Sequence, residues 1–299
     1  MSKKKNTKRM IMTVLGLILC FGIMAYPMIA NTLYDRKTDE ILTEYQSIVQ
    51  EERDYSDEWE ACAAYNAQLL EKSKVCPARF EDTSFCDTSD YERRLCVTPD
   101  GVMAYVRIPR LSLSLPVYHS TDAAVLEKGI GHIPETSLPS GGVGTHSVLT
   151  GHTGVTNKTL FTDLNKLEEG DYFYLLVLDE LHAYRVSSIH VVLPYETELL
   201  EINENEDLCT LITCTPYGVN THRLLVTGKR DPAEENRVNE TADDSLDILP
   251  EDPAPVSSTW AGKYREACLY GATLAVAVLG IGAAIRHLSK SRRKEREKE

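Results

Sequence analysis

The chain has 299 residues, of which 42% are hydrophobic, and its formal net charge is −13 at pH 7. This length leaves room for one globular domain of ordinary size with additional segments, which excludes a large multidomain assembly. Because phosphate-binding surfaces need a basic face, the acidic charge argues against nucleic acid as a partner. Basic residues gather instead at the two ends, in residues 1–9 and 286–299.

An uncharged apolar segment follows the first basic end. Residues 10–30 read MIMTVLGLILCFGIMAYPMIA, about the 20 residues that a membrane-spanning helix needs. A cleaved signal peptide is the alternative, since basic residues, an apolar core and small residues such as Ala25 and Ala30 are typical of one. The segment is longer than the roughly 7 to 15 residues of a signal-peptide core. We therefore predict a basic cytoplasmic end at residues 1–9 and a transmembrane helix at residues 10–30.

A second apolar segment lies near the other end of the chain. Residues 263–285 contain the sequence CLYGATLAVAVLGIGAAI and precede the basic tail at residues 286–299. Basic flanks of membrane spans tend to stay in the cytoplasm. The two segments together predict a two-pass protein of the cell membrane, with both termini in the cytoplasm and the middle of the chain outside.

The part between the spans divides by composition. Residues 31–72 are rich in helix-forming residues with apolar positions three and four apart, which predicts one or two amphipathic helices. Residues 73–100 lose that periodicity and form a long irregular loop, a type of segment that is often functional. Residues 231–262 are acidic, contain prolines and have few large apolar side chains, so we expect an unfolded linker back to the membrane.

Residues 101–230 have a different pattern. Short strand-like runs such as VMAYVRI, YFYLLVL and RLLVTGK are separated by turn residues. Many short strands with frequent turns predict a mainly β domain, a closed or nearly closed barrel.

The stretch TLITCTPYGVNTHR, residues 210–223, raises the question of what Cys214 does. Alternation along a strand puts Cys209 on the opposite face, so these two cysteines are not expected to pair. No second cysteine or histidine lies at the short spacing of a metal site, and we expect no metal. A buried inert thiol is the commonest role of a lone cysteine. A nucleophile would need a nearby cation or base and oxyanion donors.

Arg223 is a candidate for that cation. A hairpin at the Pro-Tyr-Gly turn would bring the following strand back beside Cys214. Alternation allows only one of His222 and Arg223 to face the thiol, and the pattern leaves open which one does. Among the eight histidines, His152 stands out because it follows the strand HSVLTG at an exposed strand end.

These motifs resemble the sortase family. TLITC with the downstream THR resembles the sortase signature TLxTC with its arginine, and LTGH resembles the histidine strand. The segments IPRLSLSLPVYH and GIGHIPETSLPSGGVGTHSVLTGHTG are similar to the pilin-polymerising class C sortases. The resemblance covers roughly residues 101–230 and implies a closed barrel of about eight strands. It also implies that Cys214 is the nucleophile, His152 the general acid and base, and Arg223 the residue that holds substrate and oxyanion.

The resemblance implies an enzyme of Gram-positive bacteria that needs no cofactor. It would cleave an LPxTG-type sorting signal through a Cys thioester and join the acyl group to an acceptor lysine of a pilin subunit. The alternatives are a housekeeping sortase that anchors proteins to peptidoglycan and a hydrolytic cysteine protease. A non-enzymatic surface protein whose C-terminal end is a sorting signal is a third reading, but LPEDP at residues 249–253 lacks the Thr-Gly that such a signal needs.

Class C sortases commonly carry a lid with an Asp-Pro-aromatic motif, which would correspond to the loop at residues 73–100. The nearest match here is VCPARF, in which Cys76 precedes Pro77 and Phe80 follows, so the acidic residue is absent. Phe80 is a candidate for the ring that covers Cys214. Four cysteines in this region, in a setting that permits disulfides, lead us to expect a lid held by disulfide bonds. They are Cys62, Cys76, Cys86 and Cys96.

Overall fold

The computed structural model describes residues 2–51, 54–75, 88–155, 157–241, 259, 262–273 and 275. The chain divides into two compact units. One consists of residues 1–30 and 257–299, and the other consists of residues 31–256. The second unit contains the β domain.

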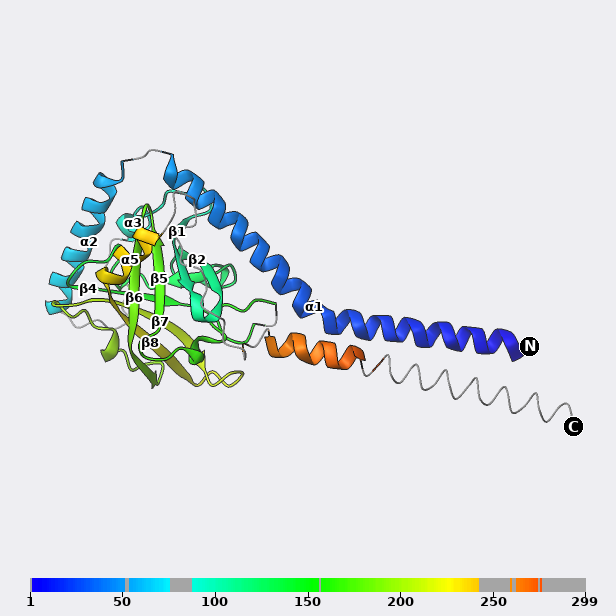
Figure 1. The fold of residues 1–299 in the computed structure, drawn as a ribbon. Coiled ribbons are helices and arrows are strands. Elements are labelled where there is room, and N and C mark those ends of the chain that lie inside the picture. Colours follow the sequence, from blue (N-terminus) through cyan, green and yellow to red (C-terminus); the bar gives the residue numbers. More distant parts are fainter. Residues whose placement is uncertain are drawn as a thin grey trace, which may run out of the picture. The chain divides into compact units, whose positions relative to one another are not determined.

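Eight strands form a closed barrel in the order β1-β2-β3-β4-β7-β8-β6-β5 (Figure 1). This confirms the predicted mainly β barrel. Most neighbours are antiparallel, whereas β2–β3 and β4–β7 are parallel pairs. The strands are β1 Val102–Ile108, β2 Leu113–His119, β3 Ile130–His132, β4 Thr145–Thr150, β5 Tyr172–Val177, β6 Glu180–Val192, β7 Asp207–Thr215 and β8 His222–Arg230.

Aromatic and aliphatic side chains fill the barrel. Phe173 of β5 and Tyr184 of β6 stack with ring centroids 5.5 Å apart, and both are fully buried. Gly228 of β8 lies against them, because a methyl group built on it would lie 2.6 Å from Cε1 of Phe173. Cys209 is buried in the same core, and burial raises the pKa of its thiol.

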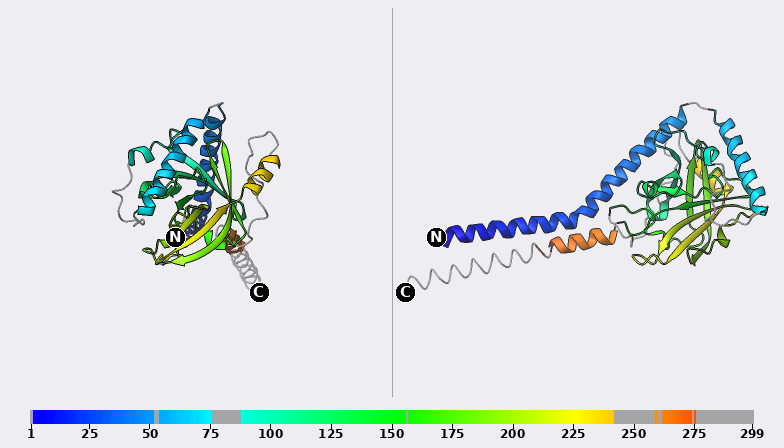
Figure 2. Two further views of the ribbon diagram at one scale, coloured as in Figure 1. Left: turned by 90° about the vertical axis from the view of Figure 1, so that its left-hand side faces the viewer. Right: turned by 180° about the vertical axis from the view of Figure 1, so that it is seen from behind.

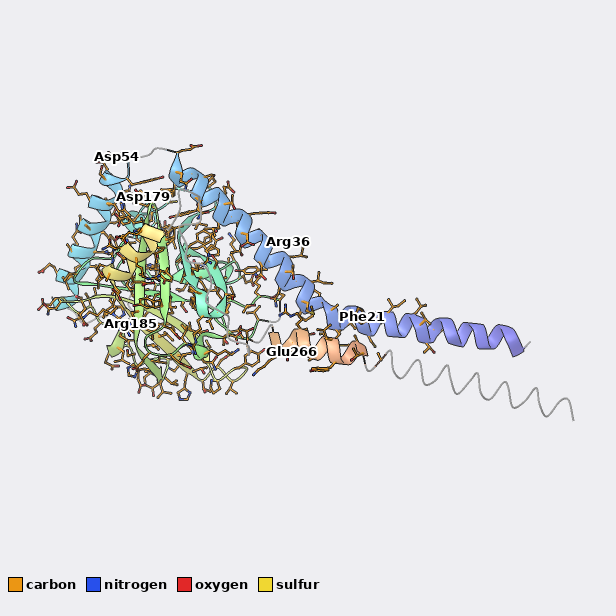
Figure 3. The ribbon with its side chains drawn as sticks, in the orientation of Figure 1. Phe21, Arg36, Asp54, Asp179, Arg185 and Glu266 are labelled. Carbon is orange, nitrogen blue, oxygen red and sulfur yellow. The ribbon has the colours of Figure 1, made fainter. Side chains whose placement is uncertain are left out.

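Helices α1 Ser2–Gln50 and α2 Ser56–Val75 precede the barrel, and α3 Thr88–Tyr91 follows them. Tyr45 of α1 is fully buried, and its hydroxyl accepts a hydrogen bond of 2.7 Å from the backbone N–H of Leu178. The side chain of Trp59, on α2, donates to Asp179 at the β5–β6 turn, over 3.3 Å (Figure 3). Both helices are therefore attached to the barrel through side chains of the predicted helical segment.

Short helices complete the β domain. They are α4 Ala123–Leu126, η2 Pro109–Leu111, η3 Leu164–Lys166 and η4 Glu198–Leu200, and the C-terminal helix of this unit is α5 Pro232–Thr241.

The expectation of an unfolded linker from residue 231 onward is wrong for its first part, because α5 packs beside β6 (Figure 2). Val238 is buried in the main core. Glu235 accepts hydrogen bonds from the backbone N–H of Ala183, over 2.9 Å, and from Nε of Arg230, over 2.8 Å. Asp231 caps the helix by accepting from the N–H groups of the first turn. Helix α5 is stable with few apolar residues because these polar contacts and the Asp231 cap also stabilise it.

Within the described residues, one helix is long and apolar enough to cross a membrane, by length and composition alone, and it covers residues 12–50. Its apolar part is exposed, as at Phe21 (Figure 3). The predicted second span at residues 263–285 falls only in part on described residues, which are 263–273 and 275 and are helical.

Candidate active site

Cys214 and Arg223 lie directly opposite each other on the antiparallel strands β7 and β8. Opposed residues in such a pair project from the same face of the sheet, so the thiol and the guanidinium share one face. His222 is opposite Thr215 and belongs to the other face. The structure therefore brings Arg223, and not His222, to the side of the candidate nucleophile.

Exposure separates Cys214 from the other cysteine of the same strand. Cys209 is fully buried, whereas Cys214 is partly exposed. The interval of five residues puts them on opposite faces, as alternation predicts. Cys214 is thus the thiol of β7 that a substrate can reach.

His152 follows the end of β4, which runs parallel to β7. The last registered pair is Thr150 with Ile212. Two further contacts continue the register, since the N–H of Gly151 donates to the carbonyl of Ile212 over 3.1 Å and Oγ1 of Thr213 donates to the carbonyl of Gly151 over 2.8 Å. His152 is therefore the residue of this segment that comes level with Cys214, and it is partly exposed.

Three residues are registered partners across the sheet: Cys214 of β7, Arg223 of β8 and Val192 of β6. His152, two residues after the last pair of β4 with β7, extends this row on the β4 side of Cys214. The candidate nucleophile therefore lies between the histidine on one side and the arginine on the other. We call this set the site row.

A small apolar cluster supports the site row. Val148, Ile212 and Leu225 come from β4, β7 and β8, and Leu200 of η4 covers them. Ile212 and Leu225 lie two residues from Cys214 and Arg223, and so on the same face of the sheet. This second core was not predicted from the sequence, although the apolar and β-branched residues on both faces of TLITC indicate a strand that is covered on both sides.

A polar layer follows beneath this cluster. Nε2 of His146 is 2.7 Å from Oγ1 of Thr210, which is 2.8 Å from Oγ1 of Thr227. Nδ1 of His146 is 2.9 Å from the carbonyl oxygen of Glu201, in the loop between β6 and β7. Burial lowers the pKa of His146, so the neutral ring is favoured. The histidine thus joins this loop to the sheet below the site row.

Two glycines shape the histidine segment. A methyl group built on Gly151 would lie 2.5 Å from Cδ1 of Ile130 and 2.9 Å from a ring carbon of Phe161, so only glycine fits. Gly154 has φ of +76°, and a methyl group there would lie 3.3 Å from the ring of Tyr217. The turn after Cys214 and the loop after His152 therefore approach each other closely.

The guanidinium of Arg223 is held by its own turn. Nη1 donates to the carbonyl oxygens of His222, over 3.1 Å, and Asn220, over 3.3 Å. The remaining donors of the guanidinium are those with which an arginine can bind a carbonyl oxygen or an oxyanion.

Two further histidines, His132 of β3 and His119 of β2, make contacts within the packing of the barrel. His132 is fully buried against Tyr91, with 3.0 Å between Nδ1 and the tyrosine hydroxyl, and burial lowers its pKa to about 4. Nε2 of His119 is 2.7 Å from the carbonyl oxygen of Arg94. Both rings serve the packing of the barrel.

The predicted lid residues Cys76, Pro77 and Phe80, and the fourth cysteine Cys86, lie outside the described residues. Cys62 and Cys96 are free thiols in the structure. The expected disulfides are therefore not found at these two positions. Cys62 is instead buried on α2 with Sγ 3.7 Å from Oε1 of Glu58, and burial raises the pKa of its thiol.

Among the residues that the structure describes, no group of three or more His, Cys, Asp or Glu side chains is arranged to hold a metal ion.

Comparison with known proteins connects this geometry to a family. A sortase domain model matches residues 106–231. Sortase D of Bacillus subtilis is 30% identical over 170 residues, which are 54% of this chain and 83% of that protein. Sortase A of Bacillus anthracis is 32% identical over 167 residues, 54% of this chain and 78% of that protein.

Solved structures of sortases are also similar to this chain. Sortase C1 of Streptococcus agalactiae is 40% identical with a TM-score of 0.60, and the match covers 64% of this chain and 98% of that one. Sortase C of Streptococcus pneumoniae is 38% identical with a TM-score of 0.58, and the match covers 64% of this chain and 97% of that one. The structure of that protein has been related to pilin substrate specificity. Together with the barrel, these relatives show that the chain belongs to the sortase family of cysteine transpeptidases.

Proposed function

We propose that this protein polymerises pilin subunits, as a membrane-anchored transpeptidase of class C type. The observation that carries the proposal is the site row, in which Cys214 of β7 is paired with Arg223 of β8 and His152 follows the other neighbouring strand, β4. Its similarity to sortase C1 and sortase C supports pilin subunits with an LPxTG-type signal as substrates.

Acylation is the first half of the proposed reaction. The thiolate of Cys214 attacks the threonine carbonyl carbon of the sorting signal, and Arg223 stabilises the oxyanion that develops. His152, as imidazolium, gives its proton to the glycine amine as the C–N bond breaks. The products are a thioester on Cys214 and a peptide with a free glycine amine.

The second half transfers the acyl group. The lysine of a second pilin subunit reacts as the neutral amine: its nitrogen attacks the thioester carbonyl carbon, and neutral His152 takes the one proton that this nitrogen loses as the bond forms. The intermediate collapses with loss of the Cys214 thiolate. An isopeptide bond forms, and both catalytic side chains return to their starting states.

Two membrane spans would keep the site on the outer side of the cell membrane, where pilins are joined. The first is the apolar part of α1, and the second is the predicted segment at residues 263–285. Basic residues on the outer ends of both segments support this orientation.

The decisive experiment offers several acceptors to one enzyme. The full chain in detergent is incubated with an LPxTG-type peptide alone, with a lysine-bearing pilin fragment, and with a peptidoglycan-type amine, and the products are identified by mass spectrometry. We expect an isopeptide bond to the pilin lysine. Transfer only to the peptidoglycan-type amine would indicate a housekeeping sortase, and release of acid in every arm would indicate a protease.

A further inference from the structure

The loop after His152 is closed on itself at its base. The N–H of Phe161 donates to the carbonyl of His152 over 3.1 Å, and the N–H of Gly154 donates to Oγ1 of Thr162 over 3.1 Å. These two bonds connect the start of the loop with its end, and Lys158 lies between the bonded residues in the chain. Contacts that hold Lys158 from outside the loop can therefore affect the position of His152.

Lys158 is held from outside the loop. Its Nζ donates to the carbonyl oxygen of Glu127 and lies 5.3 Å from the ring centroid of Tyr34. Tyr34 belongs to α1, and its hydroxyl donates to the carbonyl oxygen of Lys128 over 2.8 Å. We call these four residues, Tyr34, Glu127, Lys128 and Lys158, the Tyr34 clasp.

The Tyr34 clasp is also connected to the segment before His152, through strand β3. Residues 127–128 lead into β3, whose Gly131 pairs with Thr150 at the end of β4. Ile130 of β3 fills the space against Gly151, immediately before His152. One aromatic side chain of α1 is therefore connected to both sides of the histidine, through the loop after it and through the strand beside it.

We infer that Tyr34 and Lys158 are positioning residues for His152, so that helix α1 takes part in the catalytic geometry in addition to anchoring the protein. The inference rests on the proposed role of His152 as general acid and base. A group that transfers a proton must lie within hydrogen-bond reach of the reacting amine, and a small displacement of it slows the reaction without changing substrate affinity. A contact that only stabilises the fold would instead lower the melting temperature.

The test compares variants of the full chain in detergent. Tyr34→Leu removes the ring and the hydroxyl, and Lys158→Ala removes the cation, whereas Lys158→Arg keeps a cation for the ring. Lys128→Ala is the matched control, because its part in the clasp is a backbone carbonyl and its Nζ lies instead 6.0 Å from the ring of Tyr118. For each variant, kcat, KM, the pH profile of peptide cleavage and the melting temperature are measured.

We expect Tyr34→Leu and Lys158→Ala to lower kcat about tenfold with KM within about twofold, since misplacement of a catalytic group affects the chemical step. Their pH profiles should change, and Lys158→Arg and Lys128→Ala should stay close to the parent. An unchanged kcat per folded molecule in both clasp variants would overturn the inference, whether or not the melting temperature falls. Failure of the proposed function is a separate result, because it would show as retained activity in Cys214→Ala.

Discussion

At the scale of single residues, the two cysteines of β7 offer an internal comparison. Cys214 is partly exposed on the site row, and Cys209 is buried on the other face. We expect Cys214→Ala to abolish thioester formation while the barrel stays folded. Cys209→Ala, the control, should retain the reaction and lose about 1 kcal/mol or more of unfolding free energy through the small cavity. Trapping of the acyl-enzyme by mass spectrometry distinguishes them, and a thioester in Cys214→Ala would contradict the assignment.

The pairing of β7 with β8 makes a second prediction at this scale. Arg223→Lys keeps a positive charge but loses the planar fork of donors, so kcat/KM should fall by about tenfold or more. His222→Ala changes the neighbouring residue on the opposite face and should leave kcat/KM within about twofold of the parent. Steady-state cleavage of a sorting peptide measures both. An equal loss of kcat/KM in the two variants would contradict the assignment of Arg223, and not His222, to the face of the sheet that carries Cys214.

The buried ring of His132 leads to a prediction of how the free energy of unfolding depends on pH. Its pKa is lowered to about 4 by burial, so the folded protein binds fewer protons than the unfolded chain at pH values between about 4 and 6.5. The contribution of the neutral ring is complete above about pH 6.5 and is lost as the pH falls toward 4, and it amounts to roughly 3 kcal/mol. Denaturant unfolding at pH 7 and pH 4.5 should show a smaller pH dependence for His132→Gln than for the parent. The exposed His190→Gln is the control, and an equal slope in both variants would refute the prediction.

At the scale of elements, helix α5 shows what composition alone overlooks. The sequence DPAEE contains an N-cap aspartate, a proline at the first helical position and an early glutamate, which together indicate a helix start. Glu235 then joins the helix to Arg230 and to the backbone of β6. We expect Glu235→Ala to cost on the order of 2 kcal/mol of unfolding free energy, because partly buried donors lose their acceptor. Glu240→Ala, at an exposed position of the same helix, should be close to neutral in the same measurement.

At the scale of the whole molecule, the two apolar segments predict the orientation of the chain. The basic residues 1–9 and 286–299 favour cytoplasmic termini, so residues 31–262 should face the outside. A protease added to intact protoplasts should remove the barrel and leave tags at both termini protected. Cleavage of either terminal tag in intact protoplasts, or protection of the barrel, would rule out the two-pass arrangement.

The sequence by itself determined the features that depend on local pattern. Alternation in β7 separated Cys214 from Cys209, short strands with turns predicted the barrel, and the length of residues 10–30 predicted a span. The place of Arg223 beside Cys214 needs only a hairpin, which is local in the chain, although the sequence pattern left the choice from His222 open.

Only the tertiary structure decided the features that depend on contacts between distant segments. The parallel pairing of β4 with β7 brings His152 level with a thiol 62 residues later, and no local pattern fixes that register. The burial of Cys62 on α2 and the docking of α5 likewise depend on surfaces that the folded barrel supplies. The contact of Tyr34 with Lys158 also depends on the folded barrel, because residues so far apart in the chain meet only when long-range packing brings their segments together.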